Sequence, residues 1–290
     1  MASFALRPPL DQTHRLLSRG AVRLLVRRDW EQALPLDELL AGAPLERWGA
    51  AVPHALSGRG PVQVLGTPRG EIVAKSLRRG GLAGGLLRDT FFDARRPLRE
   101  AEAAELLTQR GVRTPPVVAA RITRRGVGLR LESATARVAG RDLIEAVAAG
   151  APIAALATAL GHTLRAAHEA GLRHRDLQAK SLLVPAGFPG PGGVDDPAPL
   201  VILDLDRCWL GDRPLDPGER RAAVVRLGRS LVKQGVLPGG VVPARAPRTA
   251  LWGCRRFARA YGASEGRFLT DLAAVLSSQV RWHRWFWPAR

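Results

Sequence analysis

Residues 174–184 read His174-Arg175-Asp176-Leu177-Gln178-Ala179-Lys180-Ser181-Leu182-Leu183-Val184. The apolar run at the end of this stretch predicts a β-strand, so the polar residues before it form a loop that leads into the strand. Three further groups lie on either side of the stretch in the chain: Gly58-Arg59-Gly60, Lys75 and Asp204-Leu205-Asp206. The order of these four groups, more than any one of them, predicts the fold.

This order is typical of an ATP-dependent phosphotransferase with a protein-kinase-like fold. In the catalytic loop of such enzymes, the Asp orients an attacking hydroxyl and accepts its proton, and a residue five positions later helps to hold magnesium. We therefore predict that Asp176 is the catalytic base. Asp204, at the end of an apolar strand, and Ser181 are the predicted ligands of Mg²⁺. Lys180 either contacts the γ-phosphate of ATP or points into solvent.

Lysine is scarce in this chain, since only three of its 44 basic residues are Lys: Lys75, Lys180 and Lys233. Lys75 nevertheless falls on a predicted strand, where a kinase needs a flexible cation that reaches the α- and β-phosphates of ATP and pairs with a helix Glu. A helix is predicted over 97–109, with Gly111 as the candidate glycine at its C-terminal end, and it offers three candidate partners: Glu100, Glu102 and Glu105. Helical spacing alone does not choose among them.

Two glycines upstream and two histidines beside the loop also receive predicted roles. Gly58 and Gly60 are predicted to bind the nucleotide, because a chain without Cβ atoms lets backbone N–H groups approach the phosphates. His168 and His174 are predicted to pack or to hydrogen-bond the backbone, and not to take part in catalysis.

Short β-like segments come first in the chain, and helical segments dominate later. Strands are predicted over 21–26, 62–65, 71–75, 117–120, 127–132 and 200–203, and helices over 37–45, 97–109, 154–170, 220–233 and 255–261. The Pro- and Gly-rich residues 185–199 are predicted to form a surface loop. The fold class is therefore α+β, a two-lobed protein-kinase-like fold with an antiparallel β-rich N-lobe and a mainly helical C-lobe. We expect an N-terminal extension over 1–50, the N-lobe over 51–134 and the C-lobe over 135–290.

The net charge of the 290-residue chain is +18, from 44 basic and 26 acidic residues. A GC-rich coding sequence explains Arg in place of Lys, but it does not explain the excess of basic over acidic residues. That excess favours a polyanionic partner, such as nucleic acid, an anionic membrane surface or a phosphorylated substrate. No apolar run of about 18 residues occurs, so no transmembrane helix is expected. No secretory signal is recognised, and the two cysteines are expected to be reduced thiols in the cytoplasm.

Several segments, taken in order, carry a more specific signal. They are Gly58-Arg59-Gly60, Arg78–Leu82 with Leu86–Asp89, Arg99-Glu100, Gly111–Pro115 with Ala119-Ala120, Leu172–Leu183, Leu203–Cys208 and Arg226–Lys233. Together they resemble the bacterial 3-deoxy-D-manno-octulosonic acid (Kdo) kinases of the lipopolysaccharide core kinase group. The resemblance implies transfer of the γ-phosphate of ATP to a sugar hydroxyl of Kdo-lipid A, at the cytoplasmic face of the inner membrane. It also implies that Glu100 is the partner of Lys75, which leaves Glu102 and Glu105 as solvated helix residues.

Three residues depart from the pattern of that family. Ser181 and Gln178 stand where Asn is usual, and Leu205 stands where Phe is usual. The departures favour one alternative, a catalytically impaired pseudokinase that acts as a binding module. A protein Ser/Thr kinase is a second alternative, although residues 208–220 show no Ala-Pro-Glu-like end of an activation loop. Charge alone suggests a nucleic-acid binder, but no nucleic-acid motif is recognised and no specific nucleic-acid partner is expected.

The expected partners are Kdo-lipid A, or a related anionic glycolipid, and the anionic membrane surface that contains it. A chain of charge +18 would bind such a surface electrostatically, at about 1 kcal/mol for each well-placed Lys or Arg. The segment Arg281–Trp287 places aromatic side chains beside basic ones, as interfacial segments do. Alternatively, these aromatic residues pack the last helix onto the C-lobe. The expected location is cytoplasmic and peripheral to the inner membrane.

Overall fold

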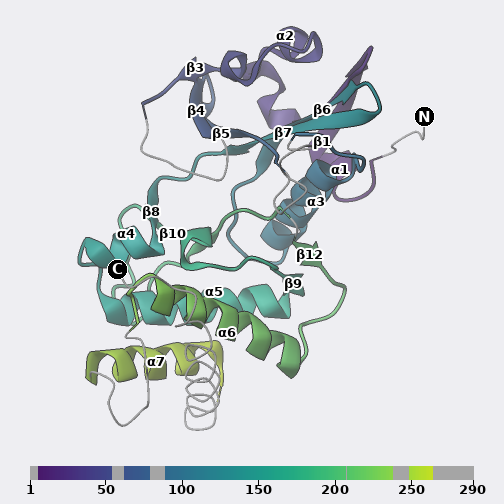
Figure 1. The fold of residues 1–290 in the computed structure, drawn as a ribbon. Coiled ribbons are helices and arrows are strands. Elements are labelled where there is room, and N and C mark those ends of the chain that lie inside the picture. The colour runs from purple at the N-terminus through teal and green to yellow at the C-terminus, as the bar shows by residue number, and fades with distance from the viewer. Residues whose placement is uncertain (1–5, 54–61, 79–88, 207, 238–247, 264–290) are drawn as a thin grey trace. The chain divides into compact units, whose positions relative to one another are not determined.

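A computed structural model describes residues 6–53, 62–78, 89–206, 208–237 and 248–263 (Figure 1). Gly58, Gly60 and the aromatic segment 281–287 lie outside the described residues, so the predictions for them stay predictions. The chain divides into two units, Met1–Leu106 with Pro115–Val138 and Leu107–Thr114 with Ala139–Arg290. We call them the β-rich unit and the helical unit and describe each on its own.

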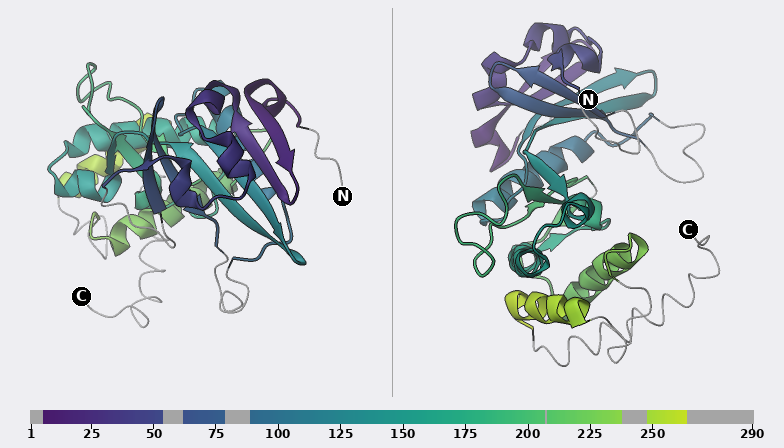
Figure 2. Two further views of the ribbon diagram at one scale, coloured as in Figure 1. Left: turned by 90° about the horizontal axis from the view of Figure 1, so that it is seen from above. Right: turned by 90° about the vertical axis from the view of Figure 1, so that its left-hand side faces the viewer.

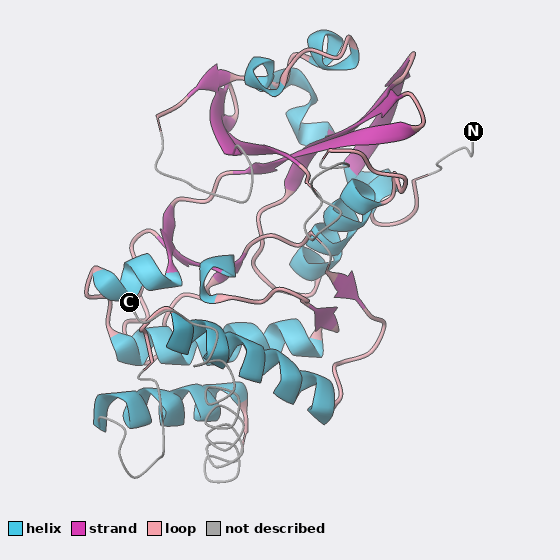
Figure 3. Cartoon of the chain, viewed as in Figure 1, coloured by secondary structure: helices cyan, strands magenta, loops and turns pink. Residues whose placement is uncertain are grey.

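The β-rich unit is built on one antiparallel sheet of seven strands (Figure 3). The strands are β1 (His14–Arg19), β2 (Val22–Arg27), β3 (Ala50–Ala51), β4 (Val62–Thr67), β5 (Gly70–Ser76), β6 (Val117–Arg125) and β7 (Gly128–Ala136). Their order across the sheet is β1-β2-β6-β7-β5-β4-β3. The strands predicted over 62–65, 71–75 and 117–120 are confirmed, each within a longer observed strand, and the strand predicted over 127–132 corresponds to β7, which begins one residue later.

Alternation along β5 gives the sheet two different faces. Ile72 and Ala74 are fully buried and belong to one hydrophobic cluster, whereas Lys75 points to the opposite face because successive side chains alternate. The cluster includes Trp30, Leu39 and Trp48 from the segment before β3, so this segment covers the first face of the sheet (Figure 2). The Lys75 face is the one that meets the following helix.

That helix, α3 (Arg96–Gln109), confirms the helix predicted over 97–109. It ends as a Schellman motif, in which Val112 N–H donates to Leu107 C=O at 2.9 Å and Gly111 N–H donates to Thr108 C=O at 3.1 Å. Gly111 takes the left-handed conformation that this ending requires, with φ +75°. The glycine read from the sequence as the end of the helix therefore has that role.

The first 50 residues do not form a separate extension. Strands β1 and β2 belong to the main sheet, and the segment between β2 and β3 holds α2 (Leu36–Leu40) and the 3₁₀ turns η1 (Arg28–Ala33) and η2 (Leu45–Trp48). A short helix, α1 (Leu10–Thr13), precedes β1. The sequence revealed the strand over 21–26 but not its partner, β6, which lies about 100 residues away in the chain. In the structure no boundary falls at residue 51.

A buried ion pair fixes this N-terminal segment to the sheet. Arg121 on β6 donates from Nε to Glu132 Oε2 of β7 at 2.6 Å, and the two side chains are 3% and 0% exposed. The same guanidinium also donates to the backbone carbonyls of Leu39 and Ala43, and it lies over the ring of Trp48. One cation therefore binds β7 and the segment that covers the sheet, which ties the two layers together.

The helical unit contains four helices and two small sheets in its described part. The helices are α4 (Leu143–Ala148), α5 (Ile153–Glu169), α6 (Pro217–Lys233) and α7 (Arg248–Tyr261). One sheet has the order β11-β10-β8 and the other pairs β12 with β9. These strands are β8 (Gly140–Asp142), β9 (Leu172–Arg173), β10 (Leu182–Pro185), β11 (Val201–Ile202) and β12 (Trp209–Leu210), with the 3₁₀ turn η4 at Ala179–Ser181. The predicted C-lobe helices and the strand over 200–203 are confirmed, and residues 185–199 form turns as predicted.

Helices α5 and α7 lie side by side, and a glycine sets their separation (Figure 1). A Cβ atom on Gly161 of α5 would lie 2.7 Å from both the Phe257 carbonyl oxygen and the Ala260 Cβ of α7. His168, one of the two histidines predicted to be structural, joins the same helices because its Nδ1 lies 2.6 Å from the Tyr261 hydroxyl. None of the helices in the described ranges is long and apolar enough to cross a membrane.

The burial of His168 predicts that the folded protein is less stable at acidic pH. Burial lowers the pKa of His168 from 6.5 to about 4. Between these values the unfolded chain binds a proton that the folded chain does not, so stability falls as the pH falls from about 6.5 to 4, by up to about 3 kcal/mol. Urea unfolding of the wild type and of His168→Gln at pH 7.5 and 4.5 should show the larger loss in the wild type. Equal losses in both proteins would contradict this assignment.

Candidate active site

The loop that opened the sequence analysis joins β9 to β10 in the helical unit. Asp176 is half-buried in it, and the Gln178 side-chain amide donates a hydrogen bond to its Oδ1 atom. The Ser181 hydroxyl donates to the Asp176 backbone carbonyl at 3.3 Å. The predicted base is therefore held at its carboxylate and at its peptide by two residues of its own loop. Gln178 received no such role from the sequence.

Leu203 connects this loop to the segment that carries Asp204. Its backbone N–H donates to the Ser181 carbonyl at 2.8 Å, and its carbonyl lies 3.3 Å from Nε2 of His174. Since a carbonyl only accepts, His174 donates from Nε2. Burial lowers the pKa of His174, which favours the neutral ring. The prediction that His174 binds backbone is confirmed, and the predicted base and metal ligand lie on segments hydrogen-bonded to each other.

Asp204 has an unusual backbone conformation. Among the described residues it is the only non-glycine residue with a positive φ, at +57°. The left-handed region disfavours residues with a Cβ atom, and Asp and Asn enter it more readily than most. The side chain of Asp204 is exposed, two residues after the end of the buried strand β11. Strained backbone of this kind is concentrated at functional sites.

The β-rich unit contributes an ion pair between β5 and α3. Lys75 Nζ lies 3.1 Å from Glu100 Oε1, with the Lys side chain 27% exposed and the Glu side chain 3% exposed. This is the pair that the resemblance to Kdo kinases implied and that helical spacing left open. The buried carboxylate holds the ammonium group at this face of the sheet.

The prediction that Glu105 is solvated is wrong. Glu105 is buried and forms an ion pair with Arg27 at the end of β2. Burial raises the pKa of Glu105, and the neighbouring Arg27 lowers it. Arg27 lies in the N-terminal segment, whose place in the sheet was not predicted, so no sequence pattern indicated a partner for Glu105.

The oxygen donors near the loop suit a hard cation. Asp204 offers a carboxylate, and the Ser181 hydroxyl keeps its lone pairs because it donates its proton to the Asp176 carbonyl. Carboxylate and hydroxyl oxygens are ligands that Mg²⁺ prefers. In the described ranges, no group of three or more His, Cys, Asp or Glu side chains is placed to hold a metal ion. The residues fit a magnesium ion that takes most of its other ligands from phosphates and water. Lys180 is exposed on η4 beside them.

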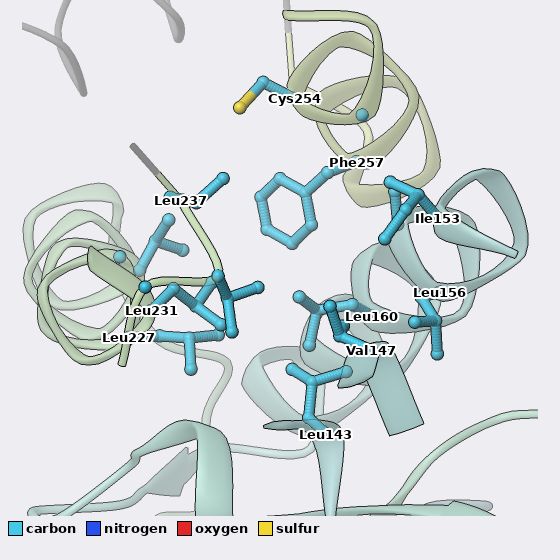
Figure 4. Close-up of a pocket in the computed structure, with 16 residues that line it drawn as sticks. Leu143, Val147, Ile153, Leu156, Leu160, Leu227, Leu231, Leu237, Cys254 and Phe257 are labelled. Atoms are coloured by element: carbon cyan, nitrogen blue, oxygen red, sulfur yellow. The ribbon is translucent and has the colours of Figure 1, made fainter. Parts of the chain in front are cut away.

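A second candidate site is an apolar pocket of about 410 Å³ in the helical unit (Figure 4). Helices α4, α5, α6 and α7 and residues 235–237 line it, with side chains that include Leu143, Ile153, Leu231 and Phe257. The lining is entirely of apolar residues, glycines and the Cys254 thiol, and burial raises the pKa of that thiol. Pockets of about 300–1,000 Å³ commonly bind small molecules. An apolar ligand in this pocket would meet no charged side chain.

These features together define a kinase-like phosphotransferase. The sheet carries a Lys–Glu pair, and the helical unit carries a His-Arg-Asp loop bonded to an Asp-bearing segment. Among solved structures, the chain is similar to WaaP in complex with acyl carrier protein, with a TM-score of 0.55, 20% identity, and coverage of 92% of this chain and 100% of that one.

Relatives narrow the class to one family. The profile of the lipopolysaccharide kinase (Kdo/WaaP) family matches residues 47–236. A 3-deoxy-D-manno-octulosonic acid kinase of Vibrio parahaemolyticus serotype O3:K6 is 26% identical over 221 residues, which cover 71% of this chain and 87% of the relative. One of Xanthomonas campestris pv. campestris (strain B100) is 30% identical over 197 residues, which cover 65% and 73%. The chain belongs to the lipopolysaccharide kinase (Kdo/WaaP) family, and it is a phosphotransferase.

The backbone at Asp204 predicts an order of stability among variants. Asp204→Ala should be less stable than Asp204→Gly by about 1 kcal/mol, because a Cβ atom disfavours the left-handed conformation by about 1–2 kcal/mol. Asp204→Asn should lie close to the wild type, since Asn tolerates this region. Urea unfolding of the three variants measures the order. Equal stability of the Ala and Gly variants would show that the positive φ carries no strain.

Proposed function

We propose that this kinase transfers the γ-phosphate of ATP to a hydroxyl of Kdo in Kdo-lipid A or a related anionic glycolipid, with Mg²⁺ as cofactor. The observation that carries the proposal is the double hydrogen bonding of Leu203, which joins the loop of Asp176 to the segment of Asp204. Phosphoryl transfer requires mainly that groups are positioned and charge is neutralised. The choice of a sugar as acceptor is taken from the names of the relatives.

Each side chain receives one role in this proposal. Asp176, held by Gln178, orients the acceptor hydroxyl and accepts its proton. Asp204 and Ser181 would hold Mg²⁺, which would neutralise phosphate charge. Lys75, held by Glu100, contacts the α- and β-phosphates. Gly58 and Gly60 are proposed to bind the nucleotide on the basis of the sequence alone. Lys180 contacts the γ-phosphate.

The charge of the chain supports an acceptor at a membrane surface. Helix α7 has no acidic residue between Arg248 and Tyr261, and its exposed side carries Trp252, Arg255 and Arg259. Basic and aromatic side chains on one helix face suit an anionic interface. We infer a peripheral location at the cytoplasmic face of the inner membrane, where an anionic glycolipid acceptor would be presented.

A turnover assay tests the proposed reaction. Purified protein, ATP, Mg²⁺ and Kdo-lipid A should give a product heavier by one phosphate in mass spectrometry. Asp176→Ala should lower the rate by at least about 100-fold, as expected for loss of a general base. Asp212→Ala, at an exposed carboxylate of the same unit, is the matched control and should leave the rate unchanged. Product formed by Asp176→Ala at the control rate would remove Asp176 from the mechanism.

Ser181 and Leu205 favour a second candidate, an impaired kinase that binds without turnover. The same assay separates the two. Nucleotide binding without product in the wild type, together with product in Ser181→Asn, would support the impaired kinase. Phosphorylation of generic protein substrates, without glycolipid product, would support a protein Ser/Thr kinase instead.

We also propose that the apolar pocket takes a long acyl chain. Its entirely apolar lining and its volume of about 410 Å³ suit such a chain, and the similar WaaP structure was solved with acyl carrier protein. Two sources supply an acyl chain of this kind, the glycolipid acceptor and an acylated carrier protein.

Filling the pocket tests that proposal. Ala157→Phe should weaken binding of acylated carrier protein or of acylated glycolipid vesicles at least about tenfold, because the ring takes the place of the chain. Ala222→Phe, on the exposed side of α6, is the control. Unacylated carrier protein and deacylated glycolipid distinguish the two sources. Equal binding by the Ala157 and Ala222 variants would argue against an acyl pocket.

A further inference from the structure

Helix α6 presents three polar side chains to the loop that carries Asp176 and to the last residue of β9 before it. Glu219 accepts two hydrogen bonds from Arg173, Nε to Oε1 at 2.7 Å and Nη2 to Oε2 at 3.0 Å. Arg226 Nη1 donates to the His174 backbone carbonyl at 3.0 Å. The Ser230 hydroxyl accepts from the Ala179 backbone N–H at 3.1 Å. The three contacts lie on both sides of Asp176 in the chain.

The three side chains form one narrow stripe on the helix. At about 100° per residue, positions 219, 226 and 230 fall within an arc of about 40°, and they span about 16 Å along the axis. The stripe therefore runs along the loop from its first residues to η4. Since all of these residues belong to the helical unit, the contacts are internal to one unit.

Side chains of the stripe make hydrogen bonds to backbone groups of the loop that strand pairing leaves without a partner. The His174 carbonyl and the Ala179 N–H lie between β9 and β10, and side chains of α6 bind them. Buried backbone groups need such partners, so loss of one would let the loop adopt other conformations. Leu203 fixes the loop through Ser181 and through the His174 ring. Helix α6 fixes the backbone at its two ends.

Helix α6 is itself firmly placed. Its N-terminus has a capping box, in which Asp216 accepts from Glu219 N–H at 2.8 Å and Glu219 Oε2 accepts from Asp216 N–H at 3.0 Å. Hydrogen bonding from Arg173 is the main cause that lowers the pKa of Glu219 to about 2, so the carboxylate is charged at neutral pH. Leu227 and Leu231 anchor the helix in the core.

We propose that Glu219, Arg226 and Ser230 are positioning residues that set the place of Asp176 for catalysis, with Arg226 as the central contact. This inference deepens the proposed function, because its effect on rate rests on Asp176 as the base. Displacement of a reacting group by about 1 Å lowers a rate by about 100-fold. Much of the Arg226 side chain is exposed, so its removal should disturb the loop more than the fold.

The role of the stripe is tested with pairs of variants, in which one removes a side-chain hydrogen bond and the other restores it. Arg226→Gln and Ser230→Ala should each lower kcat by about 10- to 100-fold and leave the nucleotide Kd and the KM for ATP within about twofold. Arg226→Lys and Ser230→Thr should recover most of kcat, because a single ammonium N–H and a threonine hydroxyl can make the same bonds. Arg221→Gln, exposed on the same helix about 140° away, is the control and should match the wild type.

Amide hydrogen exchange gives a readout that needs no acceptor. Peptides covering residues 173–181 should exchange at least about tenfold faster in Arg226→Gln than in Arg221→Gln, while peptides of α5 stay unchanged. If the wild type shows this protection but does not phosphorylate the glycolipid, the proposed acceptor is wrong and the role of the stripe is supported. Unchanged exchange and kcat in Arg226→Gln would overturn the inference. Faster exchange across the whole unit, with a matching loss of Tm, would also overturn it, because the role would then be structural.

Discussion

The hydrogen bonds at Leu203 are the constraint on which the chemistry of this protein depends. One residue offers one N–H and one carbonyl, and here the Asp176 loop binds both, through Ser181 and His174. Burial lowers the pKa of His174, and the neutral ring still donates to that carbonyl from Nε2. Since Asp204 follows Leu203 directly, a shift of the loop would move the predicted base and the predicted metal ligand together. Their separation is therefore better protected than the position of either one.

In the β-rich unit, buried ion pairs fix the positions of side chains in the same way. Glu100 is almost completely buried on α3, and the Lys75 ammonium compensates its charge. A second buried carboxylate, Glu132, is held by Arg121, whose guanidinium also binds the segment before β3. A buried charge without its partner is costly, so each pair fixes the relative position of the elements that carry it. The first pair places Lys75, and the second attaches the N-terminal segment that covers the other sheet face.

The sequence predicted the features that depend on a local pattern of residues. Short runs rich in apolar residues predicted the strands over 62–65, 71–75 and 117–120, and Gly111 marked the end of α3. It failed where two distant segments meet through single polar contacts. Arg226 and His174 are 52 residues apart, and Glu105 and Arg27 are 78 apart, so neither pair leaves a periodic pattern. The choice of Glu100 over Glu102 came from resemblance to a family, because helix geometry alone did not decide it.

The loop departs from its family at two positions, and the structure shows what the residues present do. Ser181 keeps an oxygen where Asn would offer one, and its hydroxyl proton is used by the Asp176 carbonyl. Gln178 keeps a side-chain amide, and this amide donates to the Asp176 carboxylate. A chain without Asn thus retains an oxygen donor at 181 and an amide at 178, with different side-chain lengths. An oxygen donor is preserved at 181 and an amide at 178, and the remaining variable is reach, which the backbone contacts of Leu203 and α6 control.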